Sequence, residues 1–302
     1  MARRRYTVVG LGELLWDLLP TGKQLGGAPA NFAYITSVLG DEGVPASRLG
    51  PDDLAAEAVL RLTELGLPTS FVQEDAIHPT GTVRVEVDGK GQPCFDILES
   101  VAWDFLEWTR EWRTLAAQAD AVCFGSLAQR SAESRSTIRH FLHATRQDAV
   151  RVFDVNLRQR FYTAQVLSDS MNLATIVKVN QEELPRIMQL FGLEHRDEEL
   201  SAKRLVEIHR LKLLCLTRGG GGSLLLSADA RSEHKGFAVR VVDTVGAGDA
   251  FTAGMVHEYL RGASLDQMNE AANRVGAWVA SEAGATPVLK PGGVEQTLAG
   301  IG

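Results

Sequence analysis

The 302-residue sequence has few cysteines, no surplus of positive charge and no long apolar run. Cys94, Cys123 and Cys215 are far apart and odd in number, so the sequence indicates neither a disulfide framework nor a zinc site, and a reducing cytoplasm is expected. Acidic residues outnumber basic ones by 38 to 31, which argues against nucleic acid as a partner. No apolar stretch approaches the ~20 residues that span a bilayer, and Glu13 interrupts the only candidate signal sequence, so no membrane partner is expected.

Apolar segments of strand length alternate with helical segments along most of the chain. The predicted strands are 6–11, 121–125, 152–155, 176–179 and 213–217. The predicted helices are 28–39, 55–65, 132–145, 181–190 and 200–209. Near-continuous apolar strands that alternate with helices are typical of a parallel sheet covered on both faces, so an α/β fold is predicted.

Two stretches depart from this alternation. Residues 81–89 alternate apolar and polar side chains, 88–91 predict a turn, and 93–98 predict a returning strand. Residues 14–19 could add another strand to this hairpin. No linker rich in proline, glycine or serine divides the chain, so the hairpin is expected to be a small antiparallel flap inserted in one domain.

Residues 241–251, V-V-D-T-V-G-A-G-D-A-F, carry the most informative motif. They predict a strand, a turn of small residues and a helix that begins near Gly248. A helix N-terminus has unpaired N–H groups, and Gly246, Ala247 and Gly248 have almost no side chains to keep an anion away from them. Asp249 either caps this helix or takes the proton of a hydroxyl that attacks a phosphoryl group held by those N–H groups. The segment alone leaves both interpretations open.

Other phosphate-binding motifs fit the sequence less well. The glycine–lysine pairs at 22–23 and 89–90 are not followed by serine or threonine, as a Walker A motif requires. The dinucleotide fingerprint G-x-G-x-x-G lacks its third glycine twice, because Leu15 and Phe251 occupy that place. A nucleotide-binding dehydrogenase is therefore a weaker alternative. A non-catalytic sugar sensor is another, although a pure binder would not need Asp249.

Four motifs resemble, in the same order, those of the ribokinase/PfkB carbohydrate kinases. They are similar to the family patterns G-G-x-x-x-N, N-x-x-E, T-x-G-x-x-G and D-T-x-G-A-G-D, and lie at 26–31, 180–183, 217–222 and 243–249. Residues 12–17 (G-E-L-L-W-D) and 153–158 (F-D-V-N-L-R) resemble the fructokinase-like branch. The resemblance implies a ribokinase-like three-layer α/β/α fold with a central, mainly parallel sheet. It also implies one domain over 1–302, with a small β lid inserted from about 13–25 and 69–104.

The resemblance further implies an ATP-dependent sugar kinase that transfers the γ-phosphoryl group to a monosaccharide hydroxyl. Fructose is the favoured acceptor, and 2-keto-3-deoxygluconate and ribose are alternatives. Asp249 matches the family's base, and Gly246, Ala247 and Gly248 match its anion hole. The positions that match sugar contacts are Asp17, Gly26, Gly27, Asn31, Asn156 and Arg158. The positions that match nucleotide contacts are Asn180, Thr217, Gly219, Gly222 and Asn273.

Metal sites are also implied by the resemblance. Glu183 matches a contact to Mg²⁺ through water. Many family members bind a monovalent cation such as K⁺, and the matching or nearby positions are Asp243, Val245, Val279, Glu282 and Gly284. Val288 stands where ribokinase-like chains often have serine, so the match to the potassium site is incomplete.

Several of these residues also have simpler interpretations, and the lid implies a partner. Asp17 could be a solvated turn residue, Arg158 a surface arginine, Asn180 a helix cap and Asn273 an ordinary exposed helix residue. The edge of the lid offers a surface through which a homodimer could form.

Overall fold

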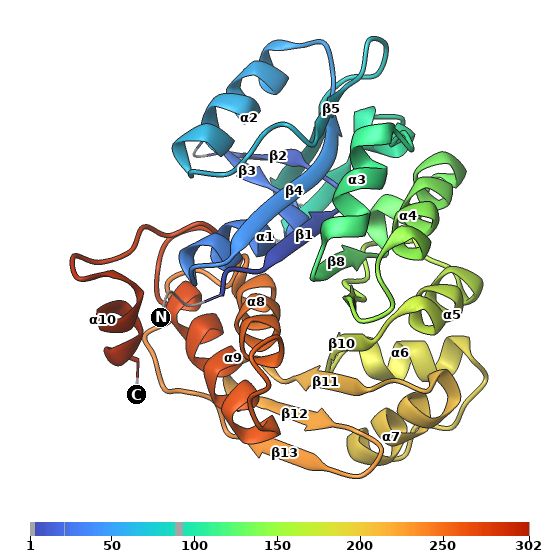
Figure 1. The fold of residues 1–302 in the computed structure, drawn as a ribbon, viewed down its shortest axis with the longest axis vertical. Helices are drawn as coiled ribbons and strands as arrows, with labels where there is room; N and C mark the ends of the chain where they lie inside the picture. The colour runs from blue at the N-terminus through green and yellow to red at the C-terminus, as the bar shows by residue number, and fades with distance from the viewer. Residues whose placement is uncertain (1–3, 21, 88–92, 302) are drawn as a thin grey trace.

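The computed structural model describes residues 4–20, 22–87 and 93–301 (Figure 1). Its helices are α1 (Ala28–Val38), α2 (Asp53–Glu64), α3 (Arg110–Gln118), α4 (Ala132–Ala144), α5 (Ala164–Leu173), α6 (Glu183–Leu190), α7 (Glu198–His209), α8 (Ala247–Tyr259), α9 (Leu265–Ala280) and α10 (Gly293–Ala299). Three short 3-10 helices are η1 (Ala102–Phe105), η2 (Leu127–Gln129) and η3 (Gly219–Gly221). In this part of the chain, no helix is both long enough and apolar enough to cross a membrane.

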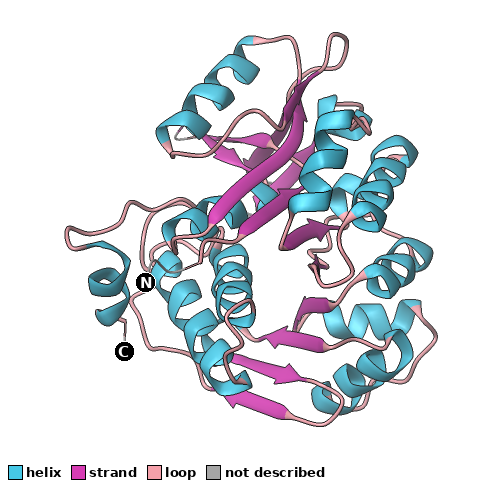
Figure 2. Ribbon diagram, viewed as in Figure 1, coloured by secondary structure: helices cyan, strands magenta, loops and turns pink. Residues whose placement is uncertain are grey.

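The strands form two sheets, coloured magenta in Figure 2. The central sheet has the order β13-β12-β11-β10-β9-β8-β1-β4-β5. Its strands are β1 (Thr7–Leu11), β4 (Glu42–Leu49), β5 (Val72–Glu74), β8 (Ala121–Gly125), β9 (Val150–Asp154), β10 (Ile176–Asn180), β11 (Leu213–Thr217), β12 (Ser223–Leu226) and β13 (Arg231–His234). All neighbours pair in parallel except β12 and β13, which add an antiparallel edge.

Helices cover both faces of the central sheet, as the predicted three-layer arrangement requires (Figure 1). Helices α3 to α7 pack on one face, where one core cluster includes Trp112, Phe141 and Phe153. Helices α1, α2, α8 and α9 pack on the other face, where a second cluster includes Phe32, Met255 and Trp278. Strands buried on both faces favour apolar side chains, which explains their near-continuous apolar sequences.

The second sheet, here called the lid sheet, has the order β3-β2-β6-β7. Its strands are β2 (Leu15–Leu19), β3 (Gly22–Gly26), β6 (Gly81–Val87) and β7 (Pro93–Ile97). Strands β2, β6 and β7 lie where strands were predicted, whereas β3 was not predicted. The pairing of β2 with β6 is parallel, so the sheet is mixed rather than purely antiparallel as predicted. The predicted turn at 88–91 lies outside the described residues.

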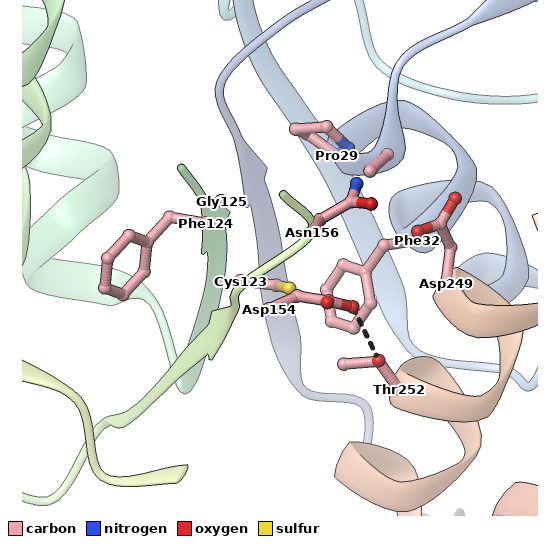
Figure 3. Close-up of a pocket in the computed structure, with 10 residues that line it drawn as sticks. Pro29, Phe32, Cys123, Phe124, Gly125, Asp154, Asn156, Asp249 and Thr252 are labelled. Carbon is pink, nitrogen blue, oxygen red and sulfur yellow. Dashed lines mark hydrogen bonds between the residues drawn. The ribbon is translucent and has the colours of Figure 1, made fainter. Parts of the chain in front are cut away.

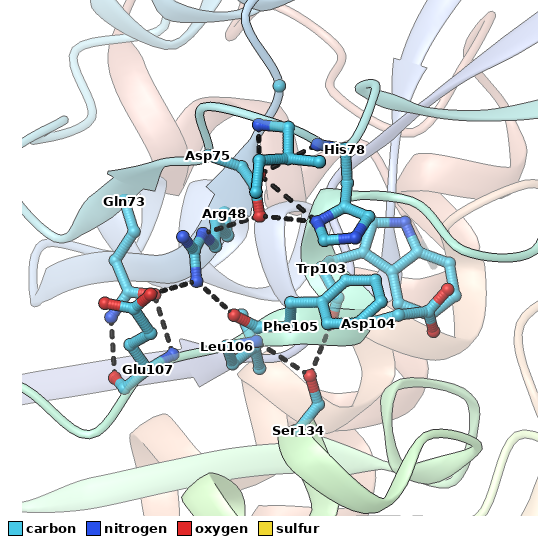
Figure 4. A network of polar contacts seen from close by, with 12 residues as sticks. Arg48, Gln73, Asp75, His78, Trp103, Asp104, Phe105, Leu106, Glu107 and Ser134 are labelled. Carbon is cyan, nitrogen blue, oxygen red and sulfur yellow. Dashed lines mark hydrogen bonds and ion pairs between the residues drawn. The ribbon is translucent and has the colours of Figure 1, made fainter.

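A buried arginine fixes the two segments through which the chain enters β6 and leaves β7 of the lid sheet (Figure 4). Arg48 of β4 lies 3.1 Å from Asp75, which precedes β6. The same guanidinium donates to the carbonyl of Phe105, which follows β7, and to Glu107 at 2.8 Å. The His78 ring stacks on Phe105 with 3.5 Å between ring centroids. The outgoing and returning arms of the lid sheet are therefore held against one another and against β4.

The strand predicted to precede the small-residue turn is wrong. Residues 235–246 contain no strand, and the N–H groups of Val242 and Asp243 donate instead to the carbonyl of Ala280 at the end of α9. Val241 and Val242 are 59% and 57% exposed, so these valines are not part of a buried sheet. The segment crosses the surface before α8 begins.

Candidate active site

The small-residue turn lies where α8 begins, beside a pocket at the ends of β8 and β9 (Figure 3). Asp249 lines this pocket together with Asp154, Asn156 and Thr252. Gly246 precedes the first helical residue with a left-handed φ of 77°. A Cβ atom at this position would lie 2.4 Å from the Cβ of Ala285, so only glycine fits. The small side chains of this turn leave the first N–H groups of α8 uncovered, and that of Ala247 donates to the carbonyl of Thr244 at 3.3 Å.

Asp249 has the properties of a general base. Burial and the charge of Asp154 raise its pKa from 3.8 to about 7, although the amide of Asn31 partly opposes the shift. The Nδ2 atom of Asn31 donates to Oδ2 of Asp249 at 2.9 Å and so fixes the orientation of the carboxylate. A base is most effective when its pKa lies near the pH at which it works. The structure therefore brings together Asn31 and Asp249, which lie 218 residues apart.

Lys178 is a site residue that sequence reasoning missed. Its Nζ atom lies 3.1 Å from Oδ1 of Asp154, and also 3.1 Å from the place that a Cβ at Gly248 would occupy. Burial alone would lower the pKa of Lys178, but the charges of Asp154, Glu183 and Asp249 raise it above its ordinary value. A permanently charged ammonium therefore stands at the small-residue turn. The signal in the sequence was a lysine within an apolar strand, I-V-K-V-N.

Asp154 links this lysine to α8. Its second oxygen accepts a hydrogen bond from the hydroxyl of Thr252 at 3.1 Å, drawn as a dashed line in Figure 3. Both oxygens of Asp154 are therefore used within the protein, and the residue is 4% exposed. These contacts suit Asp154 for holding Lys178 in place rather than for contacting a ligand.

Asn180 and Glu183 hold the start of α6 together. The Asn180 side-chain oxygen accepts from the N–H groups of Glu182 and Glu183 at 2.9 and 2.8 Å, which is the capping arrangement considered for it. Glu183 accepts from the N–H groups of Leu157 and Asn180 at 2.8 and 2.9 Å. Burial raises the pKa of Glu183, while the ammonium of Lys178 opposes the rise. Each carboxylate oxygen keeps a lone pair with which it could accept from a bound water.

The residues predicted to contact the sugar come from the lid sheet, the start of α1 and the end of β9. Gly26 ends β3, and a Cβ there would lie 2.4 Å from Oδ2 of Asp17 on β2. Gly27 follows as the residue before α1, with a φ of 110°. Burial raises the pKa of Asp17 to about 6, and the positive charge of Arg158 opposes this. Asn156 lines the pocket with a left-handed φ of 43°.

The side chain of Arg158 is exposed, but its positive charge still affects three carboxyl groups. Its guanidinium charge lowers the pKa of Glu13, Asp17 and Asp249 against the larger effect of burial. These three carboxyls lie on different segments of the chain. Arg158 donates one hydrogen bond at 3.2 Å to the carbonyl of its neighbour Leu157.

The predicted nucleotide residues also lie close together. Asn180 and Thr217 are register partners at the ends of β10 and β11, and η3 begins two residues after Thr217. Gly219 belongs to η3, and a Cβ at Gly222 would lie 2.0 Å from the carbonyl oxygen of His234. Asn273 is 8% exposed, so its interpretation as an ordinary exposed residue is wrong. It donates to the Ser223 hydroxyl at 2.7 Å and to its helix neighbour Asn269.

Part of the predicted cation loop is held by Asp243. Its two oxygens accept from the N–H groups of Val245 and Gly284 at 3.0 and 3.1 Å, so the segments before α8 and after α9 are joined. The carbonyl of Val279 accepts from the N–H of Glu282 at 3.1 Å within the end of α9. The carboxylate of Asp243 and the carbonyl of Val279 supply oxygen atoms, which are the ligands that hard cations prefer.

Within the described ranges, no group of three or more histidine, cysteine or acidic side chains could hold a metal ion by itself. Mg²⁺ is commonly bound by one or two carboxylates, several waters and the phosphates of a nucleotide. Glu183, as a single carboxylate near Lys178, fits that mode of binding. A site built only from protein ligands does not.

Comparisons with known proteins match most of the chain. The model of the pfkB family of carbohydrate kinases matches residues 19–291. A fructokinase of Escherichia coli is 30% identical over 260 residues, which cover 82% of each chain. The structure of a sugar kinase from Pyrococcus horikoshii in complex with ATP superposes with a TM-score of 0.79 at 27% identity, covering 92% of this chain and 94% of that one. A fructokinase from Xylella fastidiosa with bound ATP shares the fold, with a TM-score of 0.82 at 23% identity over 93% and 94% of the two chains.

Proposed function

The chain belongs to the pfkB family of carbohydrate kinases, and from this we propose that it transfers the γ-phosphoryl group of ATP to a hydroxyl of fructose. Family membership makes the protein a phosphotransferase with a sugar hydroxyl as acceptor, which removes the dehydrogenase and the non-catalytic sensor as alternatives. Fructose is supported by the relatives named fructokinase. Ribose and 2-keto-3-deoxygluconate remain the alternative acceptors.

One observation carries the proposal. Asp249, with a pKa of about 7 and an oxygen held by Asn31, stands beside a helix N-terminus without shielding side chains and beside the ammonium of Lys178. Phosphoryl transfer needs a base that removes the hydroxyl proton and hydrogen-bond donors that stabilise the charge on the transferred phosphoryl group.

The reaction follows from these positions. Asp249 accepts the proton of the sugar hydroxyl as that oxygen forms its bond to the γ-phosphorus. The bond between the γ-phosphorus and the bridging oxygen breaks, and ADP leaves with the electron pair. The N–H groups of Gly246, Ala247 and Gly248, with Lys178, stabilise the negative charge on the phosphoryl oxygens.

The remaining predicted residues serve binding in this proposal. Asp17, Gly26, Gly27, Asn31, Asn156 and Arg158 hold the sugar, and Asn180, Thr217, Gly219, Gly222 and Asn273 hold the nucleotide. Mg²⁺ would be held by the phosphates and, through water, by Glu183, where it would neutralise phosphate charge. The loop of Asp243, Val245, Val279, Glu282 and Gly284 would hold K⁺. We also propose that residues 1–302 form one domain and that the edge of the lid sheet supports a homodimer.

The test is a coupled ADP-release assay with fructose, ribose, 2-keto-3-deoxygluconate and a nucleoside. Fructose is expected to give the highest kcat/KM. Asp249→Asn is expected to lower kcat by ~10²- to 10⁴-fold while the protein still binds ATP, because only proton removal is lost. Asp17→Ala is expected to raise the KM for the sugar far more than that for ATP. Near-normal turnover of the Asp249→Asn variant would contradict the assignment of the base.

A further inference from the structure

Asn156, the second residue after β9, combines an unusual backbone with a place at the pocket. Its left-handed φ of 43° is uncommon for residues other than glycine, although asparagine tolerates it better than most. Figure 3 shows its carboxamide pointing toward Asp249, and no hydrogen bond joins it to the other residues drawn. A backbone conformation of this kind persists where the surrounding structure holds it, and such positions cluster at ligand sites.

The peptide group between Asn156 and Leu157 is held on both sides. Its carbonyl oxygen accepts a hydrogen bond from the hydroxyl of Ser126 at 3.3 Å, and its N–H donates to Oε1 of Glu183 at 2.8 Å. On the other side of Asn156, the N–H of Val155 donates to a carbonyl of β10 at 3.1 Å. Because a peptide group is planar, bonds to both its carbonyl and its N–H fix its orientation. The backbone of Asn156 is therefore confined between anchored peptide groups.

Ser126 is itself fixed at the end of β8. It is fully buried, and its hydroxyl does not cap η2, which it precedes. Gln129 of η2 donates from Nε2 to the carbonyl of Gly125 at 2.8 Å, and from its backbone N–H to the carbonyl of Ser126 at 3.0 Å. The hydroxyl thus reaches Asn156 from a rigid turn, and this contact is the use that the fold makes of it.

We propose that Ser126 is a positioning residue, which holds Asn156 in its left-handed conformation so that the Asn156 carboxamide faces a hydroxyl of the sugar. This inference rests on the proposed function, in which Asn156 binds the acceptor. A carboxamide both donates and accepts, so it can meet a sugar hydroxyl in either role. An orientation that is set before the sugar arrives reduces the free energy lost in ordering the segment on binding.

The experiment is a double-mutant cycle between Ser126 and Asn156. The KM values for the preferred sugar and for ATP are measured for Ser126→Ala, Asn156→Ala and the double variant. Ser126→Ala is expected to raise the KM for the sugar by about 3- to 10-fold, the range for one hydrogen bond between neutral groups. The KM for ATP is expected to stay unchanged. In the presence of Asn156→Ala, the change Ser126→Ala is expected to add less than about 2-fold, because the hydroxyl acts through the lost carboxamide.

A merely structural role of Ser126 gives a different result. The same factor from Ser126→Ala with and without the Asn156 carboxamide would overturn the proposal. An equal rise of both KM values, or no rise in the KM for the sugar, would overturn it too. Thermal unfolding shows whether each variant is folded. Ser126→Cys, which is similar in shape but a weak donor, is expected to raise the KM for the sugar in the same direction, and it keeps the test available if Ser126→Ala does not fold.

A matched control is the same substitution at another buried serine. Ser201 of α7 is 2% exposed, and its hydroxyl oxygen lies 2.7 Å from Nδ1 of His195. Ser201→Ala also removes a buried hydroxyl from a hydrogen bond, but it does so away from the pocket. We expect it to change neither KM, and a rise in the KM for the sugar as large as that of Ser126→Ala would overturn the specific role of Ser126.

The same measurements distinguish failure of this inference from failure of the proposed function. If ribose or 2-keto-3-deoxygluconate proves to be the preferred acceptor, fructose is rejected, and the cycle with that acceptor decides the role of Ser126. If Asn156→Ala leaves the KM for the sugar unchanged, the sugar contact of Asn156 and the role of Ser126 are rejected, while the kinase activity stands. Absence of turnover with every sugar would contradict both the proposed function and the role of Ser126.

Discussion

At the scale of single residues, Asp249 decides how activity depends on pH. Its pKa of about 7 means that the carboxylate needed for proton removal is lost as the pH falls through neutrality. We therefore expect kcat/KM for the sugar to rise from pH 6 to pH 8 and then to level off. Asn31→Ala removes a hydrogen bond that lowers this pKa, so it is expected to move the rise to higher pH. A profile that is flat between pH 6 and pH 8 would contradict the role of Asp249.

Lys178 leads to a second prediction at this scale. Lys178→Met removes the charge beside Gly248, and kcat is expected to fall by about 10²- to 10³-fold, as when one donor to a transition-state charge is lost. The change also leaves Asp154 buried without its cation, which costs about 3–5 kcal/mol. Kinetics on folded protein and urea unfolding measure the two effects separately. Lys203→Met, which removes an exposed lysine on α7, is the control and should change neither.

The sequence could predict most of the candidate site's residues but not their surroundings. Asp249 and Asn31 were both predicted, yet their direct contact depends on how α1 and α8 pack together. Lys178 was missed because the strand pattern predicts only that position 178 is buried, not that Asp154 of the neighbouring strand balances its charge. The simpler interpretation of Asn273 as an exposed helix residue failed because Ser223 of β12 accepts a hydrogen bond from its side chain, a contact that its own neighbours do not reveal.

At the scale of elements, the strands with continuous apolar sequences were predicted well, and short polar strands were not. Strand β3, G-K-Q-L-G, has a glycine at each end and three exposed residues. It exists because it pairs with β2, and that pairing is not visible in its own sequence. The reverse error occurred at 241–243, where adjacent valines suggested a strand. These residues contact the end of α9 instead, and tertiary contacts overrode local preference there.

The arms of the lid sheet provide a prediction at the same scale. Arg48→Met removes the cation that joins Asp75 to the segment after β7, and we expect unfolding to become easier by about 3 kcal/mol. Looser arms should also let water reach the site, so ATP hydrolysis without sugar should rise relative to sugar phosphorylation. Urea unfolding and ADP release without sugar measure these effects. The control is Arg61→Met, which breaks an exposed ion pair on α2 and should lower the free energy of unfolding by less than about 1 kcal/mol. An equal loss of stability in the two variants would contradict the role of Arg48 in holding the lid arms.

At the scale of the whole molecule, buried carboxyls act on stability in two opposite directions. Asp41 accepts hydrogen bonds from His257 and Arg261 of the α8 end, and these lower its pKa to about 2 although burial alone would raise it. A carboxyl with a lowered pKa stabilises the folded chain above about pH 4 and loses this effect as the pH falls through 2. Asp17, Glu13 and Asp249 behave in the opposite way, because burial raises their pKa values to about 6, 7 and 7.

These opposite shifts predict an acidic optimum of stability for the protein without ligands. Between about pH 4 and pH 7, the three site carboxyls bind protons in the folded chain but not in the unfolded chain, so stability falls as the pH rises through this window. We therefore expect Tm to be several degrees higher at pH 5 than at pH 8, since 1 kcal/mol shifts Tm by roughly 2–4 °C for domains of 150–250 residues. The double variant Glu13→Gln, Asp249→Asn should flatten that slope, whereas Asp41→Asn should leave it unchanged and weaken only the loss toward pH 2. An unaltered slope in the double variant would mean that protonation of Glu13 and Asp249 does not cause the fall of Tm with rising pH. The raised pKa values of these two carboxyls would then be contradicted.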